Sequence, residues 1–166
     1  GENVTVRRLA YHTVSEGVVG AYGHGDANGV RIGTIVVLKK GTSDLARDLA
    51  MQVAAMNPEY LRTEDVPAER LQKEHEIYKA QTLEQVKADG KSEDMVEKIV
   101  AGKLKKFATE VTLLGQIFVK DPSKTIEKLL KEQGAEIESF VRFEVGEGIE
   151  KKEDNFVAEV MAQVRG

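Results

Sequence analysis

The stretch AYGHGDANGVRIG, residues 21–33, holds the residue types that most readily suggest chemistry, because glycine-rich loops often cradle phosphate groups. Gly23, Gly25 and Gly29 stand there beside a histidine and an aspartate. A dinucleotide fingerprint or a P-loop needs a helix after the glycines, and a P-loop also needs a lysine. Here the following residues, VRIGTIVV, have the composition of a strand. The sequence therefore predicts a hairpin turn whose glycines supply positive φ angles.

The histidines and carboxylates form no pattern typical of catalysis or metal binding. His12, His24 and His75 fall on three different predicted elements, without a ligand pair at i, i+4 spacing. The chain has no cysteine, which excludes disulfides, thiol catalysis and thiolate metal sites. The acids at 147, 150, 153 and 154 are typical of a solvated run near a helix start. We therefore predict no cofactor, no metal site and no enzymatic activity.

Composition narrows the function further. The 166 residues are 41% hydrophobic and 31% charged, which is enough for a buried core. A net charge of −4 argues against nonspecific nucleic-acid binding, which normally needs a basic excess. No apolar run approaches the roughly 20 residues of a membrane helix, and nothing resembles a secretory signal. We expect a cytoplasmic protein that binds neither nucleic acid nor membrane, and, since it opens with Gly-Glu-Asn, a fragment.

The first third of the chain predicts strands followed by a helix. Residues 3–14, 18–22 and 30–38 are rich in Val, Thr, Ile and Gly and are interrupted by turns. Thr42 or Ser43 can cap a helix whose apolar residues recur at helical spacing until Met56. The proline of NPEYL then ends it, because the residue before proline is disfavoured in the α region.

The middle of the chain predicts a helical hairpin that projects from the core. Two charged, helix-length segments are separated by Asp89-Gly90-Lys91, with Gly90 as a stop and Ser92 as the next cap. The second segment carries a narrow apolar stripe, and the first a more ragged one. Narrow stripes on two consecutive helices joined by a tight turn are typical of an antiparallel coiled-coil hairpin.

The last third predicts a short helix, a strand and a closing helix. Ser123 can cap the helix, which Gly134 ends. In EIESFVRFEV, residues 136–145, apolar side chains alternate with Glu138, Arg142 and Glu144. EDNFVAEVMAQV then predicts an amphipathic helix. The fold class is α+β: a small antiparallel sheet packed with helices, an inserted helical hairpin and a C-terminal helix. We place the core in residues 1–66 and 111–149, the hairpin in 67–110 and a C-terminal module in 150–166.

Several stretches, in order along the whole chain, resemble the bacterial elongation factor Ts family. They include GENVTVRR, YGHG with RIG shortly after it, MQVAAMNPEYL, LKKFATEVTLLGQIFVKDPSKTIEKLLKE and FVRFEVGEGIEKKEDNFVAEV. The resemblance implies an α+β core with an inserted coiled coil. It also implies a guanine-nucleotide exchange factor for elongation factor Tu, which binds no nucleotide itself and wedges in near the Mg²⁺ and phosphate site of Tu.

The resemblance implies contacts with Tu at three places. His24 with Gly25, and Gly1 at the start of GEN, would lie at the nucleotide-binding domain of Tu; the family's turn is shorter than this one. Phe118 and Val119 would grip domain 3 of Tu, or Phe118 would lie in the core and only Val119 would be exposed. The stripe of the last helix would pack either on Tu or on its own core, with equal weight: Phe156, Val160 and Met161.

The resemblance also implies a C-terminal part of the factor. The small N-terminal Tu-binding domain and the Thr-Asp-Phe-Val motif that supplies the wedge do not occur in this sequence, and DNFV at 154–157 lies in a different context. We therefore expect weak exchange activity from this chain alone. The alternative function is a structural module for self-association, since members of the family can form homodimers through this core.

Overall fold

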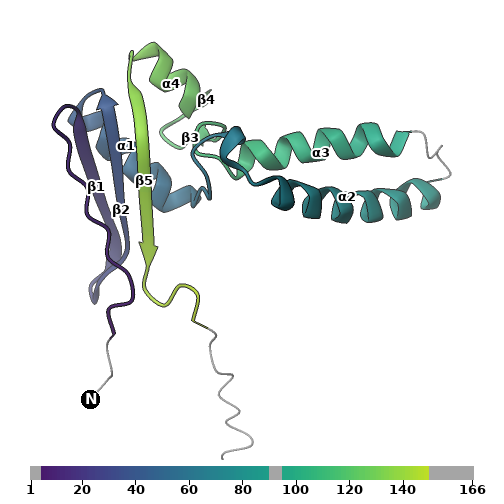
Figure 1. Ribbon diagram of the computed structural model, residues 1–166, viewed down its shortest axis with the longest axis horizontal. Coiled ribbons are helices and arrows are strands. Elements are labelled where there is room, and N and C mark those ends of the chain that lie inside the picture. Colours follow the sequence, from purple (N-terminus) through teal and green to yellow (C-terminus); the bar gives the residue numbers. More distant parts are fainter. Residues whose placement is uncertain (1–4, 90–94, 150–166) are drawn as a thin grey trace, which may run out of the picture.

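The computed structural model describes residues 5–89 and 95–149 (Figure 1). Its centre is a three-stranded antiparallel sheet in the order β1–β2–β5, formed by Val18–Asp26, Gly29–Lys40 and Glu136–Glu144. Helix α1, Ser43–Met56, packs on one face of this sheet. The two strands and the helix predicted for residues 18–56 are therefore present, and the fold mixes helices with small antiparallel sheets.

The core lies between α1 and the sheet. One row of each strand faces the helix, and Val36 and Leu38 of β2 pack against Leu49 of α1. A Cβ at Gly20 of β1 would overlap Ala46, so glycine allows α1 to approach the sheet closely. The fully buried core residues that these elements share are Val36, Leu38, Ala46, Leu49, Ala50 and Val53.

Helix α1 begins and ends where the sequence predicts. The Thr42 hydroxyl accepts a hydrogen bond from the Leu45 N–H at 3.2 Å, as an N-cap side chain does. At the other end Asn57 adopts a left-handed conformation, with φ of 44°, and its N–H donates to the Val53 carbonyl. Both ends are thus fixed by local hydrogen bonds.

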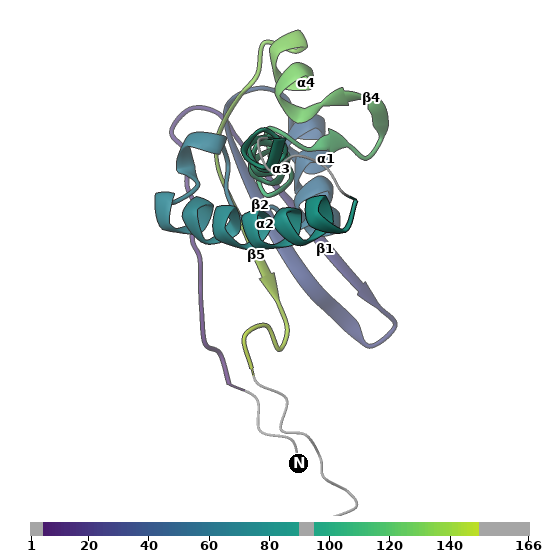
Figure 2. The same ribbon diagram turned by 90° about the vertical axis from the view of Figure 1, so that its right-hand side faces the viewer.

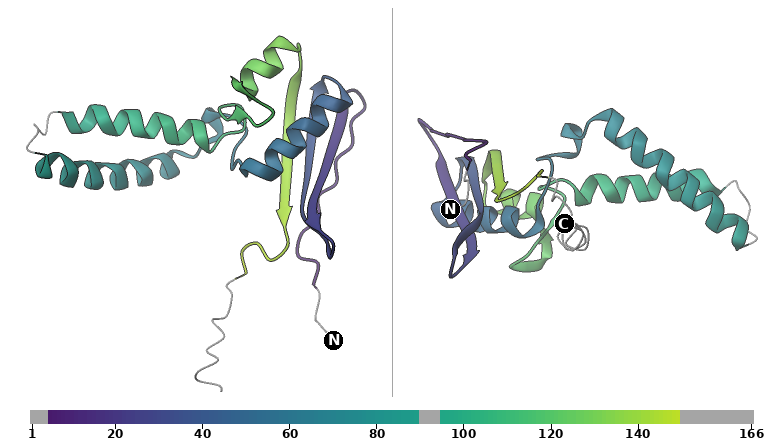
Figure 3. Two further views of the ribbon diagram at one scale, coloured as in Figure 1. Left: turned by 180° about the vertical axis from the view of Figure 1, so that it is seen from behind. Right: turned by 90° about the horizontal axis from the view of Figure 1, so that it is seen from below.

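Helices α2 and α3 project from the sheet and lie side by side (Figures 1 and 3). Helix α2 spans Ala68–Ala88 after the short 3-10 helix η1, Thr63–Asp65, and α3 spans Val96–Glu110. Their shared apolar cluster is centred on Val86, Val96 and Val100 and is separate from the main core. Coiled-coil packing remains a prediction, and the predicted stop and cap at Gly90 and Ser92 lie outside the described residues.

The region after α3 forms a small two-stranded sheet and a short helix. Strand β3, Ile117–Phe118, pairs with β4, Asp121–Thr125, and helix α4 covers Ile126–Glu132. The predicted cap at Ser123 is wrong: the Thr125 hydroxyl accepts from the Lys128 N–H instead. Ser123 lies two residues earlier on β4, where its hydroxyl and N–H both donate to Asp121.

Strand β5 departs from the simple alternation that the sequence predicts. An irregularity in its pairing with β2 lies between the Val37–Ser139 and Leu38–Ile137 pairs. As a result Ile137 packs in the core, whereas Val141 and Phe143 lie on the opposite face of the sheet. Arg142, expected among solvent-facing polar residues, points to the α1 side, and its side chain is only 9% exposed. One extra residue in a strand reverses the faces beyond it.

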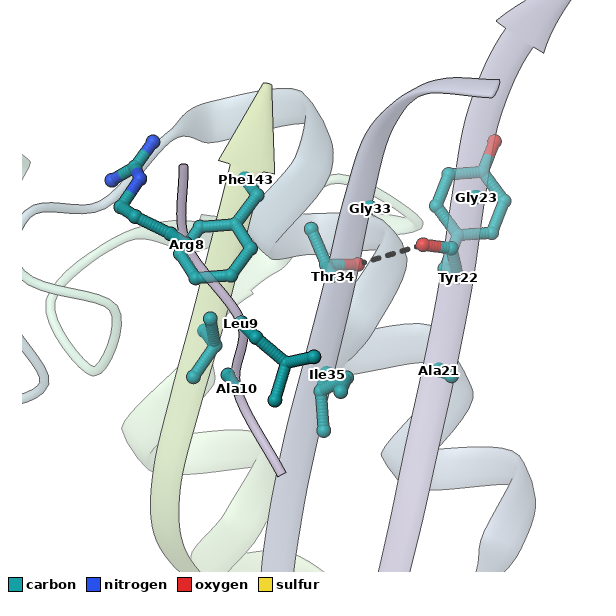
Figure 4. Close-up of a pocket in the computed structure, with 11 residues that line it drawn as sticks. Arg8, Leu9, Ala10, Ala21, Tyr22, Gly23, Gly33, Thr34, Ile35 and Phe143 are labelled. Atoms are coloured by element: carbon teal, nitrogen blue, oxygen red, sulfur yellow. Dashed lines mark hydrogen bonds between the residues drawn. The ribbon is translucent and has the colours of Figure 1, made fainter. Parts of the chain in front are cut away.

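The strand predicted for residues 3–14 is wrong within the part that the structure describes. Residues 5–14 form no strand and cross the face of the sheet opposite α1 (Figure 4). Arg7 and Arg8 bind Glu147, and the Arg8 guanidinium lies 4.6 Å from the centre of the Phe143 ring. Side-chain contacts therefore hold residues 5–14 against the sheet, and these residues do not pair with an edge strand through backbone hydrogen bonds.

Candidate partner-binding surfaces

His24 lies near the tip of the β1–β2 hairpin, in the strand rather than in the turn. The Tyr22 hydroxyl lies 3.3 Å from His24 Nδ1, and the two rings stack with centroids 6.3 Å apart. Both side chains point to the α1 side of the sheet, because alternate residues of β1 share a face. His24 itself is exposed, which leaves its imidazole accessible to a partner.

The glycines of this hairpin have different roles. Gly29 adopts a φ of 128°, as predicted for a glycine in the turn, and the Asn28 N–H donates to Asp26 Oδ1 at 2.7 Å. Gly25 has no positive φ, but a Cβ there would overlap the Gly29 carbonyl. The turn leads into strand β2, so the helix that a phosphate-binding loop needs does not follow it.

The β3–β4 turn brings Val119 to the surface. Val119 is 47% exposed and its neighbour Ile117 is 55% exposed, whereas Phe118 between them is 6% exposed and belongs to the core. The geometry matches the alternative in which only Val119 of the Phe118-Val119 pair is available to a partner. Sequence reasoning missed Ile117, which lies on β3 directly before the buried Phe118.

Two side chains of α1, Gln52 and Asp48, hold the β3–β4 turn in place. Gln52 is fully buried, and its Nε2 donates to the Ile117 carbonyl at 3.1 Å while its Oε1 accepts from the Val119 N–H at 2.9 Å. One turn earlier, Asp48 pairs with Lys120 at 2.6 Å. Residues four apart in a helix lie on the same face, so both contacts reach the turn together.

Gln116 links the same turn to two helix ends. It accepts from Gln52 Nε2 at 3.2 Å, and its own Nε2 donates to the carbonyls of Met56 and Glu110. These carbonyls end α1 and α3, where backbone acceptors have no partner within the helix. The side chains of Gln52 and Gln116 therefore form a buried hydrogen-bond network, and this network attaches the β3–β4 turn to the ends of α1 and α3. Their spacing in sequence gave no signal of this pairing.

The far end of the sheet carries a charged cluster. Figure 2 shows that the β1–β2 turn and the end of β5 lie at this same end. Glu147 accepts from Arg8 at 2.7 Å, and Arg142 pairs with Glu144 at 2.8 Å. The hydrogen bond from Arg8 is the main cause that holds the pKa of Glu147 below its ordinary value. Glu147 is thus an ion-pair partner of Arg8 and not only part of the solvated run that the sequence indicated.

Four residues that the resemblance implies as contacts lie outside the described residues: Gly1, Phe156, Val160 and Met161. Across residues 5–89 and 95–149, no group of three His, Cys, Asp or Glu side chains is placed to hold a metal ion. His75 instead lies on α2, where its Nε2 is 3.5 Å from Glu97 Oε2. In the same part of the chain no helix is both long and apolar enough to cross a membrane.

The sequence profile of the elongation factor Ts family matches residues 1–147. The chain belongs to this family of translation elongation factors. Elongation factor Ts of Legionella pneumophila (strain Paris) is 52% identical over 165 residues, which are 99% of this chain and 53% of the relative. Elongation factor Ts of Alkalilimnicola ehrlichii is 52% identical over 166 residues, and that of Francisella tularensis subsp. novicida 48%, each covering 100% of this chain and 54% of the relative.

The chain thus spans about half the length of the curated elongation factor Ts relatives that it matches. That share is consistent with a part of the factor, as the resemblance implies. The family assignment agrees with the mixture of a small antiparallel sheet and helices that the sequence predicts.

Proposed function

We propose that this chain is the part of a guanine-nucleotide exchange factor that binds elongation factor Tu in the cytoplasm. The observation that carries the proposal is the β3–β4 turn. The Val119 side chain is exposed there, while its N–H is held by the buried side chain of Gln52. Apolar anchors in preorganised positions supply most of the energy of protein interfaces, and surrounding polar contacts add little. Val119 is such an anchor.

Exchange follows from linkage rather than from bond chemistry, so the proposed role is binding and not enzymatic catalysis. A protein that binds nucleotide-free Tu more tightly than GDP-bound Tu weakens GDP binding by the same factor. In this role the Val119 turn holds the chain on domain 3 of Tu. His24, presented with Tyr22 at the end of the β1–β2 hairpin, contacts the nucleotide-binding domain. Neither contact needs a bound nucleotide, cofactor or metal in this chain.

Self-association is the second candidate, and a different surface favours it. The face of the sheet opposite α1 carries apolar side chains around an open pocket of about 440 Å³ (Figure 4). Ala21, Ile35, Val141 and Phe143 line it from three strands, and within residues 5–89 and 95–149 the segment with Arg8 and Leu9 crosses it. Apolar sheet faces of this kind are stabilised by packing against another layer. A second copy of the chain would supply that layer and form a homodimer.

Binding to nucleotide-free Tu, measured together with the size of the chain in solution, separates the two candidates. The first predicts saturable binding, and the second predicts a dimer that does not bind Tu. The release of a fluorescent GDP from Tu then measures exchange. We expect this chain to accelerate release far less than a full-length relative, because its sequence has no Thr-Asp-Phe-Val motif. Release at the full-length rate would contradict that expectation.

The hairpin with the glycines provides a further check on the proposal. If its glycines shape a turn rather than a nucleotide site, titration of the chain with GDP, GTP or ATP should give no saturable heat in calorimetry. Binding in the micromolar range would instead require a nucleotide site and would contradict the proposed role.

A further inference from the structure

An open groove of about 740 Å³ lies where α3 joins the body of the molecule. One wall carries Met56 from the end of α1 and Ile117 from β3, and the other carries Gly102, Lys105, Lys106 and Thr109 of α3. Glu110, Gly115 and Gln116 complete the lining, and we call these nine residues the α3 groove. Neither Val119 nor His24, the two residues proposed above to contact Tu, lines the groove, although it adjoins the β3–β4 turn through Ile117 and Gln116.

Gly102 is the feature of this groove that the fold itself does not explain. It lies inside α3, where glycine lowers helix stability relative to alanine. Yet a Cβ at Gly102 would meet no other atom within 4 Å, so packing within the chain does not require glycine. An exposed helical position without a side chain allows another backbone to approach closely. Its placement in a groove points to a partner from outside the described chain.

The groove combines an apolar floor with a rim of two lysines, Lys105 and Lys106, and one glutamate, Glu110. Met56 and Ile117 are both large apolar side chains that stay about half exposed. Lys105 and Lys106 lie three and four residues after Gly102, which places them on the same face of α3. Lys103 is different, because its Nζ donates to the Thr82 hydroxyl on α2. The Lys106 ammonium lies 3.6 Å from Glu110, which lines the groove one turn further along α3.

The backbone of β3 is already occupied on both sides, which limits the shape of a ligand. Strand β4 pairs with one edge, and the Gln52 amide bonds the Ile117 carbonyl and the Val119 N–H on the other. A partner cannot add a strand to an edge whose hydrogen-bonding groups are satisfied. A helix that inserts apolar side chains needs no such edge, and it fits a groove beside an existing helix.

We propose that the α3 groove binds an acidic amphipathic helix of a partner protein. The apolar face of that helix packs on Met56 and Ile117, and its backbone crosses α3 at Gly102. Its carboxylates pair with Lys105 and compete with Glu110 for Lys106, so the charges of the partner and of the two lysines are complementary. The proposal does not depend on binding of Tu, because it uses a separate surface.

The test uses the whole chain and two synthetic helical peptides with leucine on one face and either glutamate or lysine on the other. In fluorescence anisotropy we expect the glutamate peptide to bind at least ~10-fold more tightly than the lysine peptide. Gly102→Leu should weaken glutamate-peptide binding at least ~10-fold by filling the groove, without lowering the thermal unfolding midpoint, because leucine favours a helix more than glycine does.

Lys105→Glu gives a second test that leaves the groove open. It should lower the affinity for the glutamate peptide and raise the affinity for the lysine peptide. The control Val119→Asp should leave both affinities within about twofold of those of the unchanged chain. Equal binding of the two peptides, no binding of either, or unchanged glutamate-peptide binding by Gly102→Leu would overturn the proposal. If Gly102→Leu instead abolished binding to Tu, the groove would belong to the Tu surface and a separate partner would be excluded.

Discussion

The two hairpin turns of this molecule present their exposed residues on very different supports. The β1–β2 turn is shaped locally, by Gly29 and by the hydrogen bond from the Asn28 N–H to Asp26. His24 beside it contacts the side chain of Tyr22, on the same strand. The β3–β4 turn is fixed by Gln52 and by the Asp48–Lys120 ion pair, both from helix α1, whose inner face lies in the core. One turn is therefore set by its own sequence, and the other by the core behind it.

This difference bears on how each turn can contribute to binding. A turn that is already ordered loses less conformational entropy when a partner binds, so more of its contact energy appears as affinity. Val119 combines that preorganisation with an apolar side chain. His24 offers a polar contact on a more exposed hairpin, where water competes with the partner. The comparison predicts that the β3–β4 turn dominates the affinity of this chain for Tu.

The largest expected effect comes from removing the support of the β3–β4 turn. Gln52→Leu keeps a side chain of similar size but leaves the Val119 N–H, the Ile117 carbonyl and the Gln116 amide without their partner. A buried group that loses a hydrogen bond costs about 1–3 kcal/mol. The Ile117 and Val119 groups are only partly buried and lose less, so we expect the free energy of unfolding to fall by about 2–3 kcal/mol in total. Denaturant unfolding measures the change.

Gln72→Leu serves as the matched control, because Gln72 is exposed on α2 and its Nε2 donates to the exposed Glu76 at 3.5 Å. It should change stability by less than about 0.5 kcal/mol. If both substitutions cost the same, the buried glutamine network does not hold the turn, and the contrast between the two turns is lost.

The second effect concerns affinity and separates the two turns directly. Val119→Asp should weaken binding to Tu by at least ~1.4 kcal/mol, or tenfold, more than His24→Ala does. The introduced carboxylate would be desolvated without a partner at an apolar contact, which is costly. Titration calorimetry with nucleotide-free Tu measures both variants, and circular dichroism checks that both stay folded. If His24→Ala lost more affinity for Tu than Val119→Asp, the main contact with Tu would lie at the β1–β2 turn instead.

The local turn could be predicted from the sequence and the supported turn could not. The glycines, the strand that follows them and the Thr42 cap act over a few residues, so their patterns can be read directly. Gln52 and Gln116 are 64 positions apart, and nothing in either neighbourhood indicates that they meet. Whether Phe118 or Val119 faces solvent depends on that network and on the core beneath it.

The errors in the fold prediction have the same origin. The alternation in residues 136–145 is real, but the irregularity beside Ser139 depends on the pairing with β2 and reverses the faces. Residues 5–14 have strand composition, yet their contacts with Glu147 and Phe143 decide where they lie. The Ser123 cap failed because Asp121 captures the Ser123 hydroxyl. In each case a contact with another residue overrides a local preference.

A smaller effect is expected from the helical hairpin, which tests whether the support of the β3–β4 turn lies in the body. We place the hairpin in about 68–108 and propose to replace it with a short glycine-rich turn. Its apolar cluster is separate from the main core, and the bonds from Leu113 and Leu114 to Tyr60 and Leu61 remain to close its base. The free energy of unfolding should change by about 1 kcal/mol, of the order of a loop-closure term.

Tu binding by this deletion variant should equal that of the intact chain, because Glu110, which accepts from Gln116, is retained. Denaturant unfolding and calorimetry give the two readouts. Loss of cooperative unfolding would mean that the hairpin belongs to the core, and a tenfold loss of affinity would mean that it supports the turn.

The smallest effect is expected at the charged cluster near the β1–β2 turn. Arg8 lowers the pKa of Glu147, so the ionised carboxylate favours the folded state. This stability is present above the ordinary pKa of the carboxyl, 4.5, and is lost as the pH falls through the lower pKa of the folded state. The Glu147 side chain is 38% exposed, and solvent screening keeps the contribution below about 1 kcal/mol.

Arg8→Met removes the charge and keeps an apolar chain that can pack on Phe143. It should be slightly less stable than the parent at pH 7, and the difference should shrink below pH 4.5 as Glu147 takes up a proton. Arg47→Met, on the exposed side of α1, controls for the lost positive charge. A difference that stays constant from pH 7 to acid would show that Arg8 acts through packing on Phe143, not through Glu147. The N-terminal segment would then be held on the sheet by apolar contact between Arg8 and Phe143. The β1–β2 end of the sheet, like the β3–β4 turn, would then depend on packing rather than on local contacts.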